Sequence, residues 1–325
     1  MQRLLRSSLS IGILYALGAS LLWGLAFVIP KLLSNFTSIE ITLGRYFFYG
    51  IVSLGILLLV ERKHIKSYGR KIWLTALLFA FAGNIGYYFF VVYGIKYIGA
   101  PTVALIIGVL PITVSFYGNW LRREYPFSRL YAPIVLIFLG LIVVNFLGID
   151  WSHAEQITLP QRLIGLLSSF TALLLWTWYG VANSIFLKAH PRLSSSTWST
   201  LIGVSTLFLV LIIIVVTMLR GDGLGSVERY IKLDSQLLFF LLDSLILGIA
   251  VSWGGTLLWN KASALLPVSL VGQLIVLETI VGLTYVFIAD LKLPSAFELV
   301  GIVMIVAGVV FGINTTRRSD TKMKH

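Results

Sequence analysis

Apolar runs of membrane-spanning length recur along almost the whole chain and constrain its fold more than any other feature. A helix of about 20 apolar residues crosses the hydrocarbon core of a bilayer, where each segment must satisfy its own backbone polar groups. The sequence therefore predicts an all-α integral membrane protein with ten transmembrane helices. The expected helices cover residues 11–33, 39–60, 72–94, 100–121, 128–148, 163–187, 196–219, 236–259, 267–289 and 296–314.

Composition supports the same fold class. Hydrophobic residues make up 58% of the chain and charged residues only 12%, which is more apolar surface than a soluble domain can bury. The net charge of +12 resides in short loops, so it indicates membrane topology and argues against nucleic-acid binding. The apolar stretch that follows Arg3 and Arg6 is long enough to span, so we expect an uncleaved helix rather than a signal peptide.

The two halves of the sequence resemble each other. Gly12, Ala19 and the Leu-Leu-Trp run ending at Trp23 recur 153 residues later, with the second run ending at Trp176. We expect two five-helix repeats, residues 1–160 and 161–325. An odd number of crossings per repeat forces the second copy to enter the membrane from the opposite side. Such inverted repeats are typical of secondary transporters, whose substrate site lies at the repeat interface near the bilayer midplane.

The basic residues set the expected orientation. With ten helices, 17 of the 25 Lys and Arg residues fall on one side of the membrane and seven on the other, with Arg45 inside a helix. Because the positive side is cytoplasmic, we expect both termini in the cytoplasm of a multi-pass protein of the inner membrane.

Glu278 lies near the middle of the ninth expected helix, about eleven residues from either end. An ionisable group at that depth is costly and is a functional hypothesis by default. It is either a ligand for a substrate amine, a proton-coupling site, or a structural residue that bonds to a broken helix.

Arg45 in the second helix and Asp243 in the eighth both lie about two turns from the outer face. They are candidates for a charge pair or a gate. Arg45 is also a candidate ligand for a substrate carboxylate, or it extends outward to the headgroups.

Three expected helices carry amide, hydroxyl and aromatic side chains on one face, as a cavity for a part-polar small molecule requires. Hydrogen bonding between helices is the alternative explanation. The faces comprise Asn84, Tyr87 and Tyr88 on the third helix, Trp176, Tyr179 and Asn183 on the sixth, and Ser252, Trp253, Thr256 and Asn260 on the eighth.

Two further features concern backbone geometry. Pro111 is central in the fourth helix, where it removes a hydrogen bond and predicts a kink. Gly301, Gly308 and Gly312 form a small-residue stripe on the tenth helix, which suits close packing within the chain or across a homodimer.

Chemical motifs of other protein classes are missing from the sequence. The chain has no cysteine, and its four histidines fall in expected loops or the C-terminal tail, so we expect no metal, haem or other cofactor. It carries no phosphate-binding loop and no zinc-protease motif, and we expect a protein that is not an enzyme.

The sequence resembles the ten-helix EamA-type branch of the drug/metabolite transporter superfamily over roughly residues 11–314. Each motif is short, but their order, spacing and repetition are specific. The resemblance rests on the two Leu-Leu-Trp runs, on Tyr97-Ile98-Gly99-Ala100-Pro101 leading to Pro111, on Arg122-Arg123-Glu124, and on Leu277-Glu278-Thr279 in place of the family's Leu-Glu-Pro.

This resemblance implies a secondary transporter that exports amino acids or related small metabolites by alternating access. The aromatic faces favour aromatic or hydrophobic amino acids. In this picture Trp23 and Trp176 form aromatic walls, while Gln273 and Glu278 contact the polar groups of the substrate. The alternatives are a channel, a non-transporting membrane scaffold, or a membrane-embedded enzyme.

Overall fold

A computed structural model describes residues 2–33, 35–62, 65, 68–146, 158–220, 234–291 and 293–322. The described residues are almost entirely helical and contain no strand. Ten of their helical stretches are long and apolar enough to cross a membrane, which confirms the predicted fold class. They are Ser8–Phe27, Ser38–Leu59, Arg70–Ile98, Thr102–Arg122, Phe127–Val144, Leu159–Ala189, Ser195–Leu219, Ser235–Leu265, Val268–Ala289 and Ala296–Thr315.

Several spans consist of more than one helix. The first five spans contain α1 (Gln2–Gly24), η1 (Leu25–Phe27), α3 (Ser38–Leu59), α4 (Arg70–Ala80), η3 (Phe81–Ile85), α5 (Gly86–Ile98), α6 (Ala100–Ile107), α7 (Leu110–Arg122) and α8 (Phe127–Phe146), with the short α2 (Ile29–Leu32) after the first. The last five contain α9 (Leu159–Ala189), α10 (Ser195–Arg220), α12 (Ser235–Ile246), η5 (Leu247–Gly254), α13 (Gly255–Leu265), α14 (Val268–Leu274), α15 (Val276–Ala289) and α16 (Ala296–Lys322).

Local sequence explains where some of these helices start. Thr37 and Glu40 form a capping box at the start of α3, in which each side chain accepts a hydrogen bond from the other's backbone N–H. The carboxylate of Asp234 accepts from the backbone N–H of Leu237 and so caps α12. Polar residues that sequence reasoning assigns to loops therefore also set the first turn of the spans.

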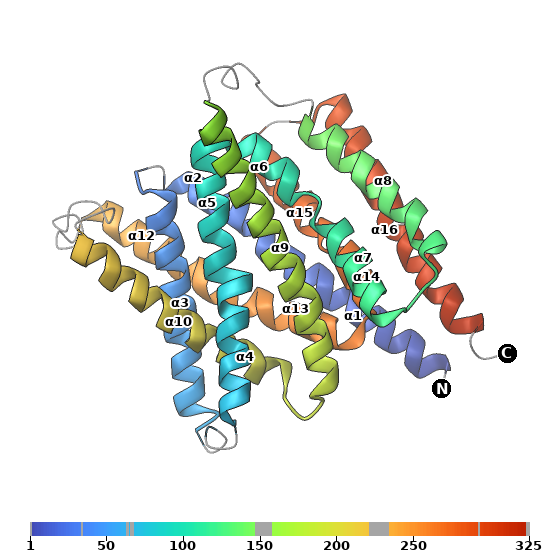
Figure 1. Cartoon of the computed structure of the whole chain (residues 1–325), viewed down its shortest axis with the longest axis horizontal. Coiled ribbons are helices and arrows are strands. Elements are labelled where there is room, and N and C mark those ends of the chain that lie inside the picture. Colours follow the sequence, from blue (N-terminus) through green and yellow to red (C-terminus); the bar gives the residue numbers. More distant parts are fainter. Residues whose placement is uncertain are drawn as a thin grey trace.

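Both chain termini lie close together at one end of the bundle (Figure 1). We call this end the terminal side and the opposite end the far side. Each span of the first half makes its most extensive contact with a span of the second half. The five pairs are α1 with α13, α3 with α10, α5 with α9, α7 with α14, and α8 with α16.

The glycine stripe of α16 is used within the chain. A Cβ added at Gly301 would lie 2.8 Å from the carbonyl oxygen of Gly140, and one at Gly308 would lie 2.9 Å from that of Pro133. Both carbonyls belong to α8, so the small residues let the α8 and α16 backbones touch. The third glycine, Gly312, contacts the side chain of Gln273 on α14. The stripe thus packs inside the monomer, rather than facing a second copy.

Four spans are interrupted near their middle. The third and eighth spans contain the π-helical segments η3 and η5. The fourth breaks between α6 and α7, two residues before Pro111, and the ninth breaks between α14 and α15, three residues before Glu278. Proline explains the break at Pro111. The ninth span breaks although Thr279 replaces the family's proline, so proline is not required there.

Candidate functional site

A cavity of about 520 Å³ lies between the two halves of the chain, in the half of the bundle toward the far side. Its walls come from the last turns of the first span, the first turns of α3, the middle of α9, and the four interrupted spans. The lining includes Trp23, Phe27, Thr42, Arg45, Tyr46, Gly83, Asn84, Tyr87, Tyr88, Ile107, Gly108, Pro111, Trp176, Tyr179, Ser252, Thr256, Glu278 and Thr279. A cavity of this size accommodates a small organic molecule.

Arg45 supplies the positive charge of this cavity. Its Nε donates a hydrogen bond of 2.8 Å to Ser252 Oγ on η5, and its guanidinium carbon lies 5.2 Å from the centre of the Tyr46 ring. These two contacts fix the direction of the side chain. Its terminal nitrogens make no hydrogen bond or ion pair among the described residues. A guanidinium held in this way presents two parallel donors, which is the geometry that binds a carboxylate.

The expected pairing of Arg45 with Asp243 is not present. Arg45 bonds to Ser252, nine residues beyond Asp243 on the same span, which is roughly 13 Å along a helix. Asp243 is not among the cavity-lining residues, and no ion pair joins it to Arg45 in the described part of the chain. The similar depth estimated from sequence ignores the direction of each side chain, so depth alone does not bring the two charged groups together.

Glu278 supplies the negative charge of the cavity. It lies in the first turn of α15, directly after the break in the ninth span. Its carboxylate has no hydrogen bond or ion pair within the described ranges, and the side chain is half-buried. The unpaired N–H groups at a helix start favour a nearby carboxylate, so the break offers a partial compensation for a buried negative charge. Arg45 and Glu278 thus line one cavity without forming an ion pair.

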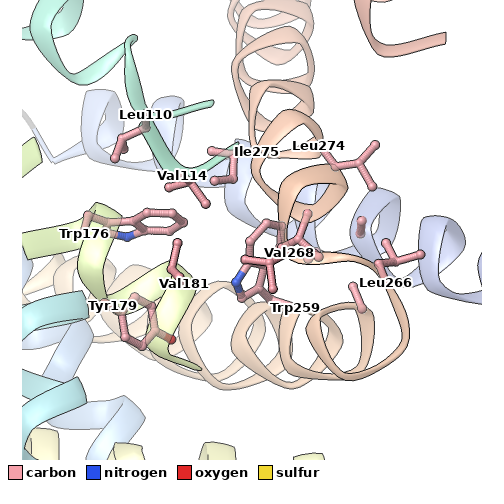
Figure 2. Packing of buried hydrophobic residues seen from close by; sticks show 14 of the residues in the cluster. Leu110, Val114, Trp176, Tyr179, Val181, Trp259, Leu266, Val268, Leu274 and Ile275 are labelled. Atoms are coloured by element: carbon pink, nitrogen blue, oxygen red, sulfur yellow. The ribbon is translucent and has the colours of Figure 1, made fainter. Parts of the chain in front are cut away.

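The repeated tryptophans of the two halves converge beneath the cavity. Trp23 and Trp176 line it, and their ring centres lie 5.2 Å and 6.2 Å from that of Trp259, which is completely buried. Tyr179 lies edge-on to Trp176 at 5.8 Å. Figure 2 shows Trp176 and Trp259 approaching each other from α9 and α13. These rings form an aromatic floor between the cavity and the terminal half.

The polar face of the third span also turns toward the cavity. Asn84, Tyr87 and Tyr88 all line it, and the amide nitrogen of Asn84 donates a 3.0 Å hydrogen bond to Thr206 on α10. Asn84 therefore has a structural bond as well as a place in the wall. The structure brings these three residues together with Trp23, Arg45, Pro111, Trp176, Tyr179 and Glu278 around one cavity.

Three residues that we expected to contact substrate lie outside the cavity lining. Asn260 is fully buried, where it accepts from the Asn183 amide at 2.8 Å and donates to Ser199 Oγ at 2.9 Å. Trp253 points toward α10, with its indole nitrogen 3.4 Å from the hydroxyl of Thr200. Both side chains lie outside the lining for one reason, which is that each bonds to a neighbouring helix.

Gln273 is the third of these residues outside the lining. It is buried on α14 with its amide oxygen against Gly312 of α16. It therefore fills the space between two helices behind the cavity. A π-helical segment or a break changes which side of a span faces inward, and no sequence periodicity reports such a shift.

Sequence reasoning missed the part played by the π-helical segments. Gly83 and Asn84 of η3 and Leu247 and Ser252 of η5 all line the cavity. Segments of this kind are rare and occur often at functional sites. The only sequence signal was glycine near the middle of both spans, at Gly83 and at Gly248.

Among the described residues, no group of three His, Cys, Asp or Glu side chains is close enough to hold a metal ion. The chemistry available in the cavity is recognition by one guanidinium, one carboxylate, hydroxyl and amide groups, and aromatic rings.

Known proteins are similar to this chain over nearly its whole length. The EamA-like transporter family matches residues 10–146. Inner membrane protein YtfF of Escherichia coli (strain K12) is 32% identical over 315 residues, which cover 93% of this chain and 94% of that protein. Uncharacterized transporter YyaM of Bacillus subtilis (strain 168) is 22% identical over 294 residues, or 90% of each protein.

A solved crystal structure shows the same fold. It superposes with a TM-score of 0.70 at 17% identity, covering 93% of this chain and 96% of that chain. The ten apolar helices and the inner membrane relative support a multi-pass inner membrane protein. The family match and the relatives point to a transporter rather than an enzyme. The chain belongs to the EamA-like transporter family of the drug/metabolite transporter superfamily.

Proposed function

We propose that this protein is a secondary transporter that exports amino acids or similar small zwitterions by alternating access. The observation that carries this proposal is the presence of Arg45 and Glu278 in one cavity, each with a charged group that no described residue pairs. A zwitterion carries a carboxylate for the first and an ammonium for the second. Its side chain would lie against the aromatic rings, which favours aromatic or hydrophobic amino acids.

The helix pairings support a chain built from two inverted repeats, residues 1–160 and 161–325. If span n of the first half is equivalent to span n + 5 of the second, the pairs α3–α10, α7–α14 and α8–α16 join equivalent spans. The other two pairs, α1–α13 and α5–α9, join the first span to the eighth and the third span to the sixth. The same relation converts each of these two pairs into the other. The interrupted spans, the third with the eighth and the fourth with the ninth, are equivalent as well. This pattern is what a pseudo-two-fold axis through the cavity produces.

The basic residues support a cytoplasmic terminal side, so that the cavity lies toward the outside. Reporter fusions test this orientation. We expect fusions near Arg123, Arg192 and Lys261 to report the cytoplasm, and fusions near Asp150 and Asp222 to report the outside. The last two positions lie outside the described residues. A single loop reported on the wrong side would contradict both the five-plus-five division and the orientation.

Transport by purified protein in proteoliposomes tests the function. We expect uptake of labelled aromatic or hydrophobic amino acids to saturate, and vesicles preloaded with the unlabelled solute to show counterflow. A sugar and a polyamine serve as controls, because a neutral sugar lacks both charged groups of a zwitterion and a polyamine lacks the carboxylate. Flux without saturation or counterflow would indicate a channel. A lack of flux for every solute, in protein that retains its fold, would favour a scaffold.

A further inference from the structure

One carboxylate outside the cavity joins the two halves of the chain at the terminal side. Glu124 lies two residues beyond the end of α7. One of its oxygens accepts a 2.8 Å hydrogen bond from the backbone N–H of Val268. The other accepts from the backbone N–H of Ser269 at 3.0 Å and from the Ser269 hydroxyl at 2.7 Å. Val268 and Ser269 begin α14 and are completely buried.

The turn that carries Glu124 is held in place by its own residues. Arg123 adopts the left-handed conformation, with φ of 49°, and so ends α7 and redirects the chain. The buried side chain of Asn119 donates to the carbonyl of Tyr125 at 2.8 Å and accepts from the Tyr125 N–H at 2.9 Å. These two bonds fix Tyr125, and the Arg123 N–H donates to the Asn119 carbonyl at 2.7 Å, so the residues on both sides of Glu124 are held and the carboxylate is positioned in advance.

The segment that Glu124 binds is the junction between α13 and α14, where the chain is not continuously helical. Leu266 and Pro267 are extended, with ψ of 152° and 143°, between the end of α13 and the start of α14. Lys188 on α9 also holds this junction, where it donates a 2.5 Å hydrogen bond to the carbonyl of Leu266. A break of this kind can act as a hinge if the contacts that hold it are released.

These contacts lie on the route from the cavity to the terminal side. Next to the rings of the aromatic floor, Val114 of α7, Val181 of α9 and Val268 of α14 lie between the three helices (Figure 2). All three are completely buried, so no path leads through them in this conformation. A solute that leaves the cavity toward the terminal side has to separate helices that are packed together here, α14 and α7 among them. Separation there breaks all three bonds to Glu124.

We propose that Glu124 is the latch of the transport cycle, which holds the terminal side closed by gripping the start of α14. The inference rests on the alternating access of the proposed function, but it can be tested without any substrate. The Glu124 bonds form while the cavity lies toward the far side, and they break when α14 moves away from α7. Glu124 is therefore a conformational residue that does not touch the solute.

Accessibility of single cysteines tests this latch, because the chain contains no cysteine of its own. Val181→Cys reports opening of the terminal side, and Val91→Cys, in the cavity wall, reports opening of the far side. Both are measured in purified protein with a water-soluble thiol reagent. A neutral amide at position 124 cannot accept all three bonds, so Glu124→Gln should raise the labelling rate at position 181 about tenfold and lower the rate at position 91.

Ser269→Ala is a milder companion that removes one of the three bonds, and it should raise labelling at position 181 by about threefold. Glu298→Gln is the matched control. Glu298 also caps a helix, accepting from the backbone N–H of Ser295 at 2.6 Å, but it bonds only within its own segment. It should leave both labelling rates unchanged. If Glu124→Gln and Ser269→Ala lower the melting temperature while both labelling rates stay as in the parent protein, the carboxylate is an ordinary helix cap and the latch is refuted.

Discussion

Replacing Arg45 with Gln should reduce transport of zwitterionic solutes by about 100-fold or more. The terminal nitrogens of Arg45 face the cavity without a protein partner, and the Nε bond to Ser252 aims the side chain. Charge-assisted hydrogen bonds to a carboxylate contribute roughly 1.5–3 kcal/mol each, and every 1.4 kcal/mol is about tenfold in affinity. Initial rates of amino acid uptake into proteoliposomes measure the effect. Arg45→Lys should retain part of the activity, because it keeps the charge but loses the two parallel donors.

Asp243→Asn provides the control for this prediction. Asp243 lies at a similar depth but outside the cavity lining and without an ion pair to Arg45, so we expect transport within about twofold of the parent protein. The double variant should show the product of the two single effects, since the sites do not touch. If the double variant transports better than Arg45→Gln alone, the result would support the interaction between Arg45 and Asp243 that the sequence predicted. If Arg45→Gln transports as fast as the parent protein, Arg45 does not take part in substrate recognition.

The spans could be predicted from sequence because the bilayer leaves a chain few alternatives. Lipid cannot satisfy backbone polar groups, so apolar length alone predicts a helix, and all ten spans are found where hydropathy places them. Their ends are less predictable. The sixth span begins at Leu159 rather than near residue 163, because Thr158 and Gln161 form a capping box that extends it. Capping depends on a few polar atoms, which a hydropathy average does not resolve.

The cavity was predictable only in part. Asn84, Tyr87 and Tyr88 share a face by simple helical spacing, and the structure turns all three toward the cavity. The same argument fails on the eighth span, where Ser252 and Thr256 line the cavity but Asn260 bonds to Asn183 and Ser199. A polar side chain in a membrane protein can bond to another helix, line a cavity, or do both, as Asn84 does. Which of these occurs depends on the facing helix, and a single sequence does not contain that information.

The proposed role of Glu124 could not be predicted from the sequence for a related reason. Glu124 sits among Arg122 and Arg123 at the end of a span, where charged residues are common at a membrane surface. Two of its three donors are backbone N–H groups of residues about 145 positions away, and the third is the Ser269 hydroxyl. Backbone donors leave no mark on the sequence, so only the arrangement in space distinguishes this carboxylate from a solvated one.

Replacing Glu278 with Gln should reduce both net transport and exchange by about 100-fold while the protein keeps its fold. The carboxylate lies in the cavity with no bond to any described residue, and we expect it to hold the ammonium of the solute. Gln preserves the shape of the side chain and is less costly to bury, so the melting temperature should stay the same or rise. Glu298→Gln is the matched control, because it also removes one carboxylate but does so at an exposed helix cap. It should leave transport unchanged.

Two assays on the same variant separate a ligand from a proton carrier. Accumulation driven by an imposed pH gradient requires a coupled proton, whereas exchange of labelled for unlabelled solute requires only that the solute bind and the protein change conformation. If Glu278 binds the ammonium, Glu278→Gln loses both activities together. If it carries the proton instead, the variant loses accumulation but still exchanges solute, because Gln cannot be deprotonated. Full accumulation with unchanged pH dependence would show that Glu278 only stabilises the break in the ninth span.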